Sequence, residues 1–311
     1  MKIFVTGGCG FIGHNVVNKL QNHHKITIVD NETDYGTIPQ SEIQQLLVER
    51  KQGFIHKDIA NFTIASPIVH DLISFHKPDV IIHLASFPRQ KVVNKNPMMG
   101  SKSMSEGLLN LLDASYKNSV RRFIYVSSSM VYGNWNGAVQ EDKVCNPIGQ
   151  YAVMKYAGEM LVKDYARKGL DYNIIRPSAV YGPKDVNDRV VSKFLHSAKN
   201  GKTLTVNGEL EMLDFTYVED TRDGIVGIVE NLDKTRNETY NIARGNARTI
   251  IEAAELCIKL SGKGSINVVD RDNNFPSRGP LDCSKAIQHF GYSPSIDIEQ
   301  GFKNYWEWIT R

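Results

Sequence analysis

Short apolar runs alternate with longer amphipathic stretches through the first half of this chain. The apolar runs indicate strands and lie at residues 3–5, 26–29, 53–56, 80–84, 122–126 and 172–175. The intervening stretches have helical periodicity, most clearly at residues 11–21, 107–118 and 151–168. Because strands that alternate with helices form parallel sheets with helices on both faces, the pattern predicts an α/β fold with a doubly wound parallel sheet.

The pattern becomes mixed after Pro177. Helices are expected at residues 190–200, 220–231, 250–260 and 298–309, and strands at residues 203–206, 214–218 and 239–242. The chain has no internal repeat, low-complexity tract or long linker. We therefore expect a doubly wound domain over residues 1–178, to which segments near 214–245 return. A smaller, discontinuous mixed α/β lobe should come mainly from residues 179–311.

Three glycines follow the first predicted strand and lead into the first predicted helix. Gly7 permits a sharp turn, Gly10 lets the backbone approach a pyrophosphate, and Gly13 lets the helix pack closely on the sheet. The first amides of that helix, at Phe11 and Ile12, and its positive dipole end would hold a diphosphate. A Rossmann-type domain binds dinucleotides in this way, although a glycine-rich turn without a ligand is the alternative.

The second predicted strand ends in Asp30, where a carboxylate can accept hydrogen bonds from a ribose 2′-hydroxyl. The same charge would repel a 2′-phosphate, so the sequence predicts NAD rather than NADP. Its place after a strand favours this role over an ordinary turn formed with the next residue. A short helix over residues 41–51 should lie above the cofactor. The other expected cofactor contacts stand at or near strand ends and are Asn31, Asp58, Ile59, Leu84, Ala85, Ser86 and Pro177.

Composition narrows the class of protein further. The chain has 311 residues, 41% of them hydrophobic and 23% charged, which is typical of a soluble globular protein. A net charge of +3 is too small to indicate binding to nucleic acid or to a membrane surface. The four cysteines and the histidines have no spacing typical of a metal site or a disulfide framework. Without a signal segment or an apolar run of roughly 20 residues, the protein is expected to be cytoplasmic.

Tyr151 and Lys155 lie four residues apart, and therefore on one face of a predicted helix. Such a pair alone is common by chance, but this one follows the serines at 127–129 at the end of the fifth predicted strand. Positive charge from Lys155 and the nicotinamide should lower the pKa of the phenol from its ordinary value of about 10. With Ser128 holding the substrate oxygen, this group could remove a proton from a secondary alcohol while hydride leaves for NAD.

At these residues the chain resembles the extended short-chain dehydrogenase/reductase family, especially its nucleotide-sugar epimerases and dehydratases. The matching motifs are T-G-x-x-G-x-x-G at 6–13, S-S-S-M-V-Y-G at 127–133, R-P-x-x-V-Y-G-P at 176–183 and D-F-T-Y-V-E-D at 214–220. The resemblance implies Ser128, Tyr151 and Lys155 as catalytic residues and a nucleotide sugar in the smaller lobe. It also implies a homodimer formed by helices near residues 97–118 and 150–168.

The two residues after Ser128 separate the reactions of that family. Its 4,6-dehydratases have Asp-Glu there and its decarboxylases usually have a glutamate at the second position, whereas this chain has Ser129 and Met130. A methionine cannot transfer protons, and Asp30 disfavours the reductases that use NADPH. The sequence therefore favours a 4-epimerase, which oxidises the sugar at C4 and returns the hydride to the other face. A C4 dehydrogenase that releases the keto sugar is the alternative, and a non-catalytic NAD sensor is disfavoured by the tyrosine–lysine pair.

Two departures from the family pattern concern the substrate diphosphate. Ala179 stands where the family usually has an asparagine, and Leu213 stands where it usually has an arginine. A charge-assisted contact with phosphate contributes about 1.5–3 kcal/mol, so another cation should compensate, with Arg278 the first candidate. The expected substrate contacts are Arg89, Ser128, Ser129, Met130, Ala179, Arg189 and Arg278.

Overall fold

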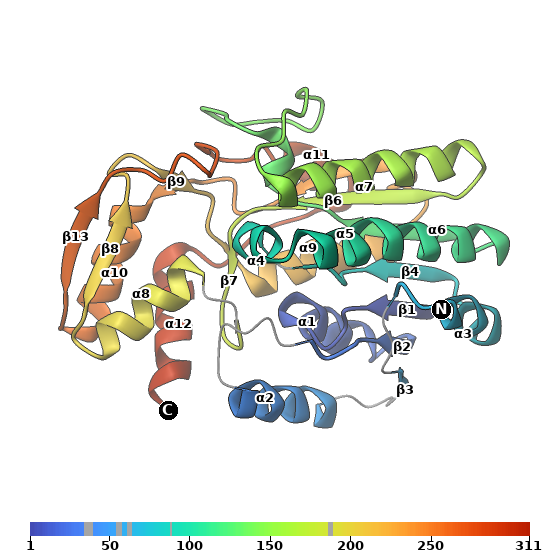
Figure 1. Ribbon diagram of the computed structural model, residues 1–311, viewed down its shortest axis with the longest axis horizontal. Coiled ribbons are helices and arrows are strands. Elements are labelled where there is room, and N and C mark those ends of the chain that lie inside the picture. Colours follow the sequence, from blue (N-terminus) through green and yellow to red (C-terminus); the bar gives the residue numbers. More distant parts are fainter. Residues whose placement is uncertain (34–39, 54–57, 61–63, 88, 186–188) are drawn as a thin grey trace.

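A computed structural model describes residues 1–33, 40–53, 58–60, 64–87, 89–185 and 189–311 (Figure 1). Within these residues a seven-stranded parallel sheet has the order β11-β6-β5-β4-β1-β2-β3. Its strands are β1 Lys2–Thr6, β2 Lys25–Val29, β3 Asp58–Ala60, β4 Val80–His83, β5 Arg122–Val126, β6 Tyr172–Pro177 and β11 Glu238–Ile242. This order confirms the predicted Rossmann-type doubly wound sheet.

Helices cover both faces of the sheet. They are α1 Phe11–Leu20, α2 Gln40–Gln52, α3 Ile68–His76, α4 Gln90–Lys95, α5 Pro97–Ser101, α6 Gly107–Lys117, α7 Gln150–Arg167 and α9 Val218–Glu230. Alternate residues of β1 point to opposite sides, so Ile3 and Val5 pack in the core that contains α1 and α9. Phe4 packs in the second core, which contains α3, α6 and α7. No helix in the described ranges is long and apolar enough to cross a membrane.

The third expected strand lies mostly outside the described residues. It covers residues 53–56, of which 54–56 are not described, and β3 is described at Asp58–Ala60. Helix α2 continues to Gln52, and the Gly53 amide donates to the Glu49 carbonyl at the end of that helix. Gly53 therefore belongs to the end of α2, and the rest of the expected strand stays a prediction. The helix expected at 41–51 is confirmed as α2.

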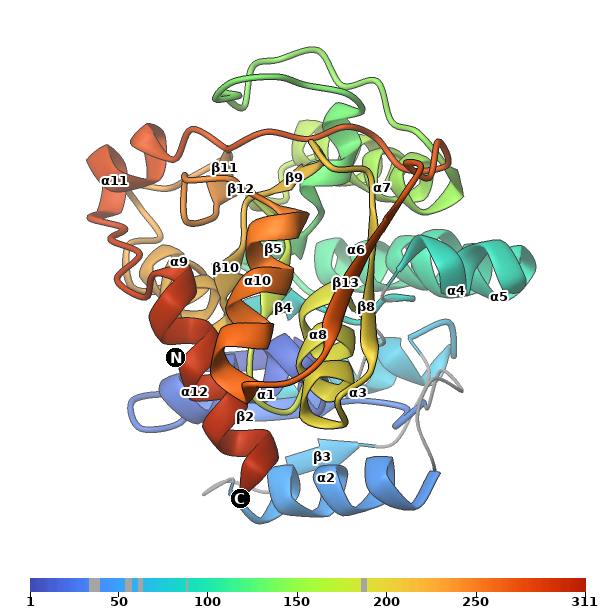
Figure 2. The same ribbon diagram turned by 90° about the vertical axis from the view of Figure 1, so that its left-hand side faces the viewer.

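The smaller lobe is built from short sheets and the helices that cover them (Figure 2). Its elements are β7 Val180–Tyr181, α8 Val190–Lys199, β8 Thr203–Asn207, β9 Met212–Leu213, β10 Thr216–Tyr217, β12 Arg248–Thr249, α10 Ile250–Ser261, β13 Ser265–Val269 and α12 Ile298–Thr310. Helix α11 Ser284–Phe290 instead packs against β11 and α9, in the core of the main sheet. Helices α8, α10 and α12 share a separate core with β8. Strand β13, which the pattern does not predict, pairs with β8 and is mostly exposed.

A buried ion pair joins α7 to β6. The Arg176 guanidinium lies 2.6 Å (Nη2–Oε2) and 3.0 Å (Nε–Oε1) from the Glu159 carboxylate, and both side chains are almost completely buried. The Ser127 hydroxyl donates to the same carboxylate at 2.6 Å. The pair therefore ties α7 and β6 to the loop that leaves β5.

Replacing Glu159 by Gln should lower the free energy of unfolding by roughly 3–5 kcal/mol, because it leaves the Arg176 charge buried without a counter-charge. Urea unfolding measures the change. Asp164→Asn, on the exposed side of α7, is the matched control. Its pairs with Arg167 and Lys168 are solvent-exposed, so the cost should stay below about 1 kcal/mol. Equal costs for the two variants would contradict this account of the buried pair.

Candidate active site

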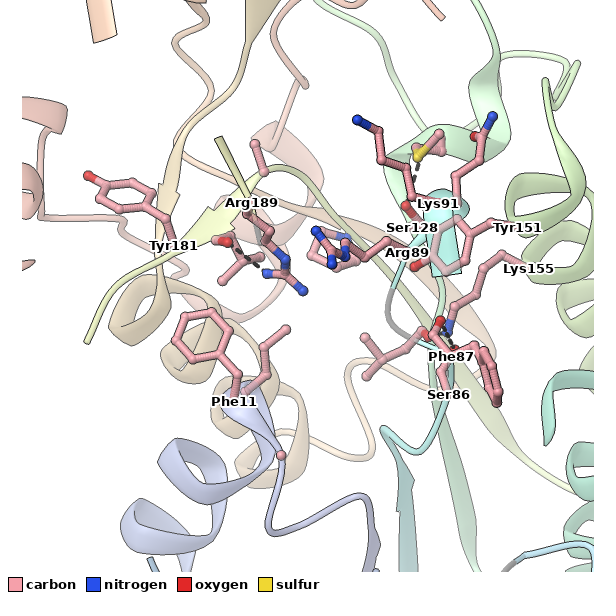
Figure 3. A pocket seen from close by; sticks show the side chains of 18 of the residues that line it. Phe11, Ser86, Phe87, Arg89, Lys91, Ser128, Tyr151, Lys155, Tyr181 and Arg189 are labelled. Carbon is pink, nitrogen blue, oxygen red and sulfur yellow. Dashed lines mark hydrogen bonds between the residues drawn. The ribbon is translucent and has the colours of Figure 1, made fainter. Parts of the chain in front are cut away.

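A cavity of about 660 Å³ lies between the carboxyl edge of the sheet and the smaller lobe (Figure 3). It is lined by the turn after β1, the residues that follow β2, β4, β5 and β6, and parts of α8 and β8. Ligands of doubly wound sheets bind at this edge, because the carboxyl ends of parallel strands meet there. Its volume suits a small-molecule site.

The turn between β1 and α1 accepts only glycine at two positions. Gly7 has φ of +72°, and a Cβ atom on it would lie 2.6 Å from the Ala85 amide nitrogen. A Cβ atom on Gly13 would overlap the Gly7 carbonyl oxygen. Gly10 caps α1, whose first turn has no side-chain cap and no acidic residue. The amides at Phe11 and beyond are therefore open to an anion at the positive end of the helix.

Asp30 stands beside this turn. Its carboxylate accepts hydrogen bonds from the Cys9 amide at 2.9 Å and from the Glu32 amide at 2.8 Å. Burial raises the pKa of Asp30, and these two hydrogen bonds oppose that shift. The carboxylate thus lies at the tip of β2 beside the helix terminus, which is the arrangement that an adenosine ribose and a pyrophosphate require. The residues present fit NAD.

The structure brings most of the other expected cofactor residues to the same cavity. Ile12, Asn31, Leu84, Ala85, Ser86 and Pro177 line it. Leu84 is fixed by the donation of its amide to the Thr6 carbonyl at 3.0 Å. The backbone of Asp58 and Ile59 forms β3, but their side chains lie outside the described residues. Their contact with adenine stays a prediction.

Tyr151 and Lys155 project from the first turns of α7 into the cavity wall, with only 9% and 5% of their surface exposed. The Lys155 ammonium donates to the Val126 carbonyl at 2.8 Å, at the end of β5. Ser128, in the loop after β5, forms a hydrogen bond with Tyr151 and accepts one from the Met130 amide at 3.2 Å. Figure 3 shows Ser128, Tyr151 and Lys155 in the same part of the cavity.

Burial dominates the electrostatics of this group. It raises the pKa of Tyr151, while the Arg189 charge and the Ser128 hydrogen bond lower it. Burial also lowers the pKa of Lys155 to about 7, against the raising effect of the Glu159 carboxylate. Arg189 is thus a source of positive charge that lowers the pKa of the phenol, and the sequence does not predict this role. The lowering expected from Lys155 and the nicotinamide stays a prediction. The Lys155 ammonium donates its hydrogen bond to the Val126 carbonyl.

The expected substrate contacts also line the cavity. Arg89, from the loop after β4, and Arg189, before α8, point toward each other in its centre (Figure 3). The Arg189 guanidinium donates to the Val180 carbonyl at 2.9 Å and lies 5.6 Å from the centre of the Phe11 ring. Burial lowers the pKa of Arg278 to about 10, and the Glu211 carboxylate opposes this shift.

The remaining expected contacts form a largely apolar wall. Ser129 is buried, and Ala179 has φ of +35°, which is unusual for a residue other than glycine. Met130 packs in one cluster with Phe87 and Tyr151. The wall beside the Tyr151 phenol is therefore a thioether and an aromatic ring rather than an acid.

Arg50 is absent from the residues that the sequence predicts for the site. Its side chain comes from α2, is 4% exposed and lines the cavity. The available signal is its spacing, since Arg50 falls four residues after the buried Leu46 and thus on the inner face of the helix. A buried guanidinium needs hydrogen-bond acceptors. Those of Arg50 are backbone carbonyls from distant parts of the chain.

Replacing Lys155 by Met should flatten the pH dependence of stability. Folding lowers the pKa of Lys155 from 10.5 to about 7, so between these values the unfolded chain binds a proton that the folded chain does not. The wild-type free energy of unfolding should therefore rise with pH across this window, by up to about 1.4 kcal/mol per pH unit. Below about pH 7, Lys155 is charged in the folded protein, and the free energy of unfolding is lowered by the full cost of burying this charge.

Urea unfolding across the same window measures this slope. Lys168→Met, an exposed lysine at the end of α7, is the control and should keep the wild-type slope. A Lys155→Met protein whose stability rises with pH as steeply as that of the wild type would show that Lys155 does not titrate in this range.

Comparison with known proteins agrees with this geometry. Residues 3–243 match the NAD dependent epimerase/dehydratase family. The chain is 29% identical over 313 residues to an uncharacterised UDP-glucose epimerase of Bacillus subtilis, covering 98% of this chain and 96% of that protein. It is 31% identical over 315 residues to UDP-glucuronic acid decarboxylase 6 of Arabidopsis thaliana, covering 97% of this chain and 86% of that protein.

A solved structure has the same fold over the whole chain. The UDP-glucuronic acid 4-epimerase of Bacillus cereus, crystallised with UDP-glucuronic acid and NAD, superposes with a TM-score of 0.91 at 27% identity, covering 100% of this chain and 99% of that chain. The glycine turn and the residues beside it fit the same cofactor. The family match extends over most of the sequence. The chain therefore belongs to the NAD-dependent epimerase/dehydratase family, the nucleotide-sugar enzymes of the extended short-chain dehydrogenase/reductase type.

Proposed function

We propose that this protein is an NAD-dependent nucleotide-sugar 4-epimerase. The observation that carries the proposal is the position of Ser128, Tyr151 and Lys155 on the same cavity as the glycine turn. Epimerases of Bacillus subtilis and Bacillus cereus are among the similar proteins, and so is a decarboxylase of Arabidopsis thaliana. The choice of epimerisation therefore depends on the residues that line the cavity.

The three side chains have separate tasks in this proposal. Tyr151 removes the proton from the sugar C4 hydroxyl. Ser128, which forms a hydrogen bond with Tyr151, holds that hydroxyl in line. Lys155 places positive charge within 6.0 Å of the centre of the Tyr151 ring. NAD, when bound, supplies the acceptor for the C4 hydride and later its source. After the keto sugar presents its other face, Tyr151 returns the proton to the C4 oxygen.

The cavity wall favours epimerisation over elimination or decarboxylation. Four carboxylates line the described part of the cavity, namely Asp30, Glu32, Glu211 and Asp272. Asp30 and Glu32 lie beside the glycine turn, and Glu211 forms an ion pair with Arg271 at 3.1 Å. None of the four belongs to the segment after Ser128, where Met130 stands. The part of the wall that packs against Tyr151 thus lacks an acid to transfer protons at the neighbouring sugar carbons.

The alternative is a C4 dehydrogenase that releases the keto sugar. The two reactions share every step up to the ketone. They differ in net NADH, because only the epimerase returns the hydride to the sugar. A panel of UDP-, GDP-, CDP- and dTDP-sugars, followed by nicotinamide absorbance and by NMR of the sugar, distinguishes them. A C4-inverted sugar without net NADH supports the epimerase. NAD binding without turnover of any sugar would favour a sensor.

Tyr151→Phe should lower turnover by roughly 10²–10⁴-fold, because general acid–base catalysis typically contributes that factor. NAD binding should stay close to wild type, since the ring and its packing remain. Product NMR and calorimetric titration with NAD measure the two quantities. Tyr156→Phe, on the same helix, is the control and should retain turnover. Unchanged turnover in Tyr151→Phe would refute the assignment.

We also infer that the protein is a homodimer. Helices α6 and α7 lie side by side (Figure 1) and each exposes a pair of apolar side chains seven residues apart. Leu109 and Tyr116 on α6, and Val153 and Met160 on α7, are 44–50% exposed and form what we call the helical patch. A spacing of seven places each pair on one helix face, so a second copy could cover the patch with the same helices.

Leu109→Lys combined with Met160→Lys should convert the dimer to a monomer, since it buries two charges at the interface. Light scattering after size-exclusion chromatography measures the mass. Leu210→Lys, at an exposed leucine in the loop between β8 and β9, is the control and should leave the mass unchanged. A double variant with the wild-type dimer mass, or a monomeric wild type, would exclude the helical patch as the interface.

A further inference from the structure

One buried guanidinium links the glycine turn to the smaller lobe. Arg50 on α2 donates through Nη1 to the Cys9 carbonyl at 2.9 Å and through Nη2 to the Lys184 carbonyl at 2.7 Å. Cys9 lies inside the glycine turn, and Lys184 lies in the loop after β7. The two carbonyls are 175 positions apart in the sequence (184 − 9) and are joined through a single side chain.

The cofactor side of this link is held from two directions. The Cys9 carbonyl accepts from Arg50, and the Cys9 amide donates to the Asp30 carboxylate at 2.9 Å. Asp30 is the expected acceptor for the ribose, and the amides after Cys9 are the expected site of the pyrophosphate. A dinucleotide that binds to Asp30 and to these amides would therefore contact the groups beside Cys9, the residue whose carbonyl accepts from Arg50.

The other side of the link leads to the centre of the cavity. Lys184 has φ of +65°, a left-handed conformation that is uncommon for lysine and needs support from its surroundings. Asp185 follows it, with a carboxylate 3.9 Å from the Arg189 guanidinium and a backbone carbonyl that accepts from the Tyr305 hydroxyl at 3.1 Å. Arg189 then points into the cavity (Figure 3).

We propose that Arg50 is a positioning residue that couples the binding of NAD to the placement of Arg189. NAD that orders the glycine turn would fix the Cys9 carbonyl, and Arg50 would transfer this order to Lys184. The Asp185 carboxylate, next in the chain, would then hold the Arg189 guanidinium in the cavity. Coupling between two sites is reciprocal, so a firmly placed loop also favours NAD binding. The coupling needs only NAD, so it does not depend on which sugar is the substrate.

Arg122 is the matched control, because it is a buried arginine that stabilises the fold away from the cavity. It is also buried and donates through Nη1 to the Asn173 side chain and through Nη2 to the Leu232 carbonyl, both at 2.8 Å. The Nε atoms of Arg50 and Arg122 both lack a hydrogen-bond partner within the described residues. Arg122 begins β5, at the edge of the sheet opposite the cavity. Both arginines are thus buried and donate two hydrogen bonds through their Nη atoms, but only Arg50 lies beside the cavity.

The test compares Arg50→Lys, Arg50→Met and Arg122→Lys with the wild type. Lysine keeps the charge but cannot reach two carbonyls with one planar fork, and methionine keeps only an apolar chain. Calorimetric titration gives the NAD affinity, hydrogen–deuterium exchange over residues 178–195 reports the loop with and without saturating NAD, and thermal unfolding shows that each variant is folded.

NAD should slow exchange over residues 178–195 in the wild type. Both Arg50 variants should bind NAD roughly tenfold more weakly, the scale of one charge-assisted hydrogen bond, and should lose this protection even at saturating NAD. Arg122→Lys should be destabilised but keep wild-type NAD affinity and protection. The proposal is overturned if NAD does not protect the wild-type loop, if the Arg50 variants keep the protection, or if Arg122→Lys loses it equally.

Discussion

The chemistry that we propose for this site depends on a lysine side chain that is kept away from water. Lys155 is almost fully buried, and burial lowers its pKa to about 7. Its surroundings limit that cost, because the Val126 carbonyl accepts its hydrogen bond and the negative charge of Glu159 opposes the shift. Glu159 in turn is held by Arg176, so the buried ion pair also fixes the carboxylate that opposes the effect of burial on Lys155.

The fold places this charge beside the cofactor and gives the substrate a second wall. The carboxyl edge of the parallel sheet brings the glycine turn and Ser128 together, and α7 adds the tyrosine and lysine one turn apart. The smaller lobe contributes Arg189 from the opposite side of the cavity, where its charge acts on Tyr151. The proposed catalysis would therefore use residues of both lobes. The hydrogen bonds of Arg50 to the Cys9 and Lys184 carbonyls link the two lobes directly.

The spacing of residues along the chain predicts much of the fold and of the candidate site. The features that it does not predict depend on packing between distant segments. The three glycines from Gly7 lie in one turn, and Tyr151 and Lys155 lie on one helix. Their relative positions follow from their spacing in the sequence, so they can be predicted from it. Strand β13 is mostly exposed, so its residues do not form the apolar run by which a buried strand is predicted. The role of Arg50 and the effect of Arg189 on the phenol both depend on contacts between lobes, so no local pattern contains them.

The measurement that tests the proposed reaction most directly follows the C4 hydrogen itself. UDP-glucose and UDP-glucuronic acid carrying deuterium at C4 would be incubated with the NAD-loaded protein, and NMR of the sugar recorded together with nicotinamide absorbance. The 4-epimerase account predicts a C4-inverted sugar that retains deuterium at C4, with no net NADH. A keto sugar that has lost its deuterium, accompanied by reduced cofactor, would contradict it and identify a dehydrogenase.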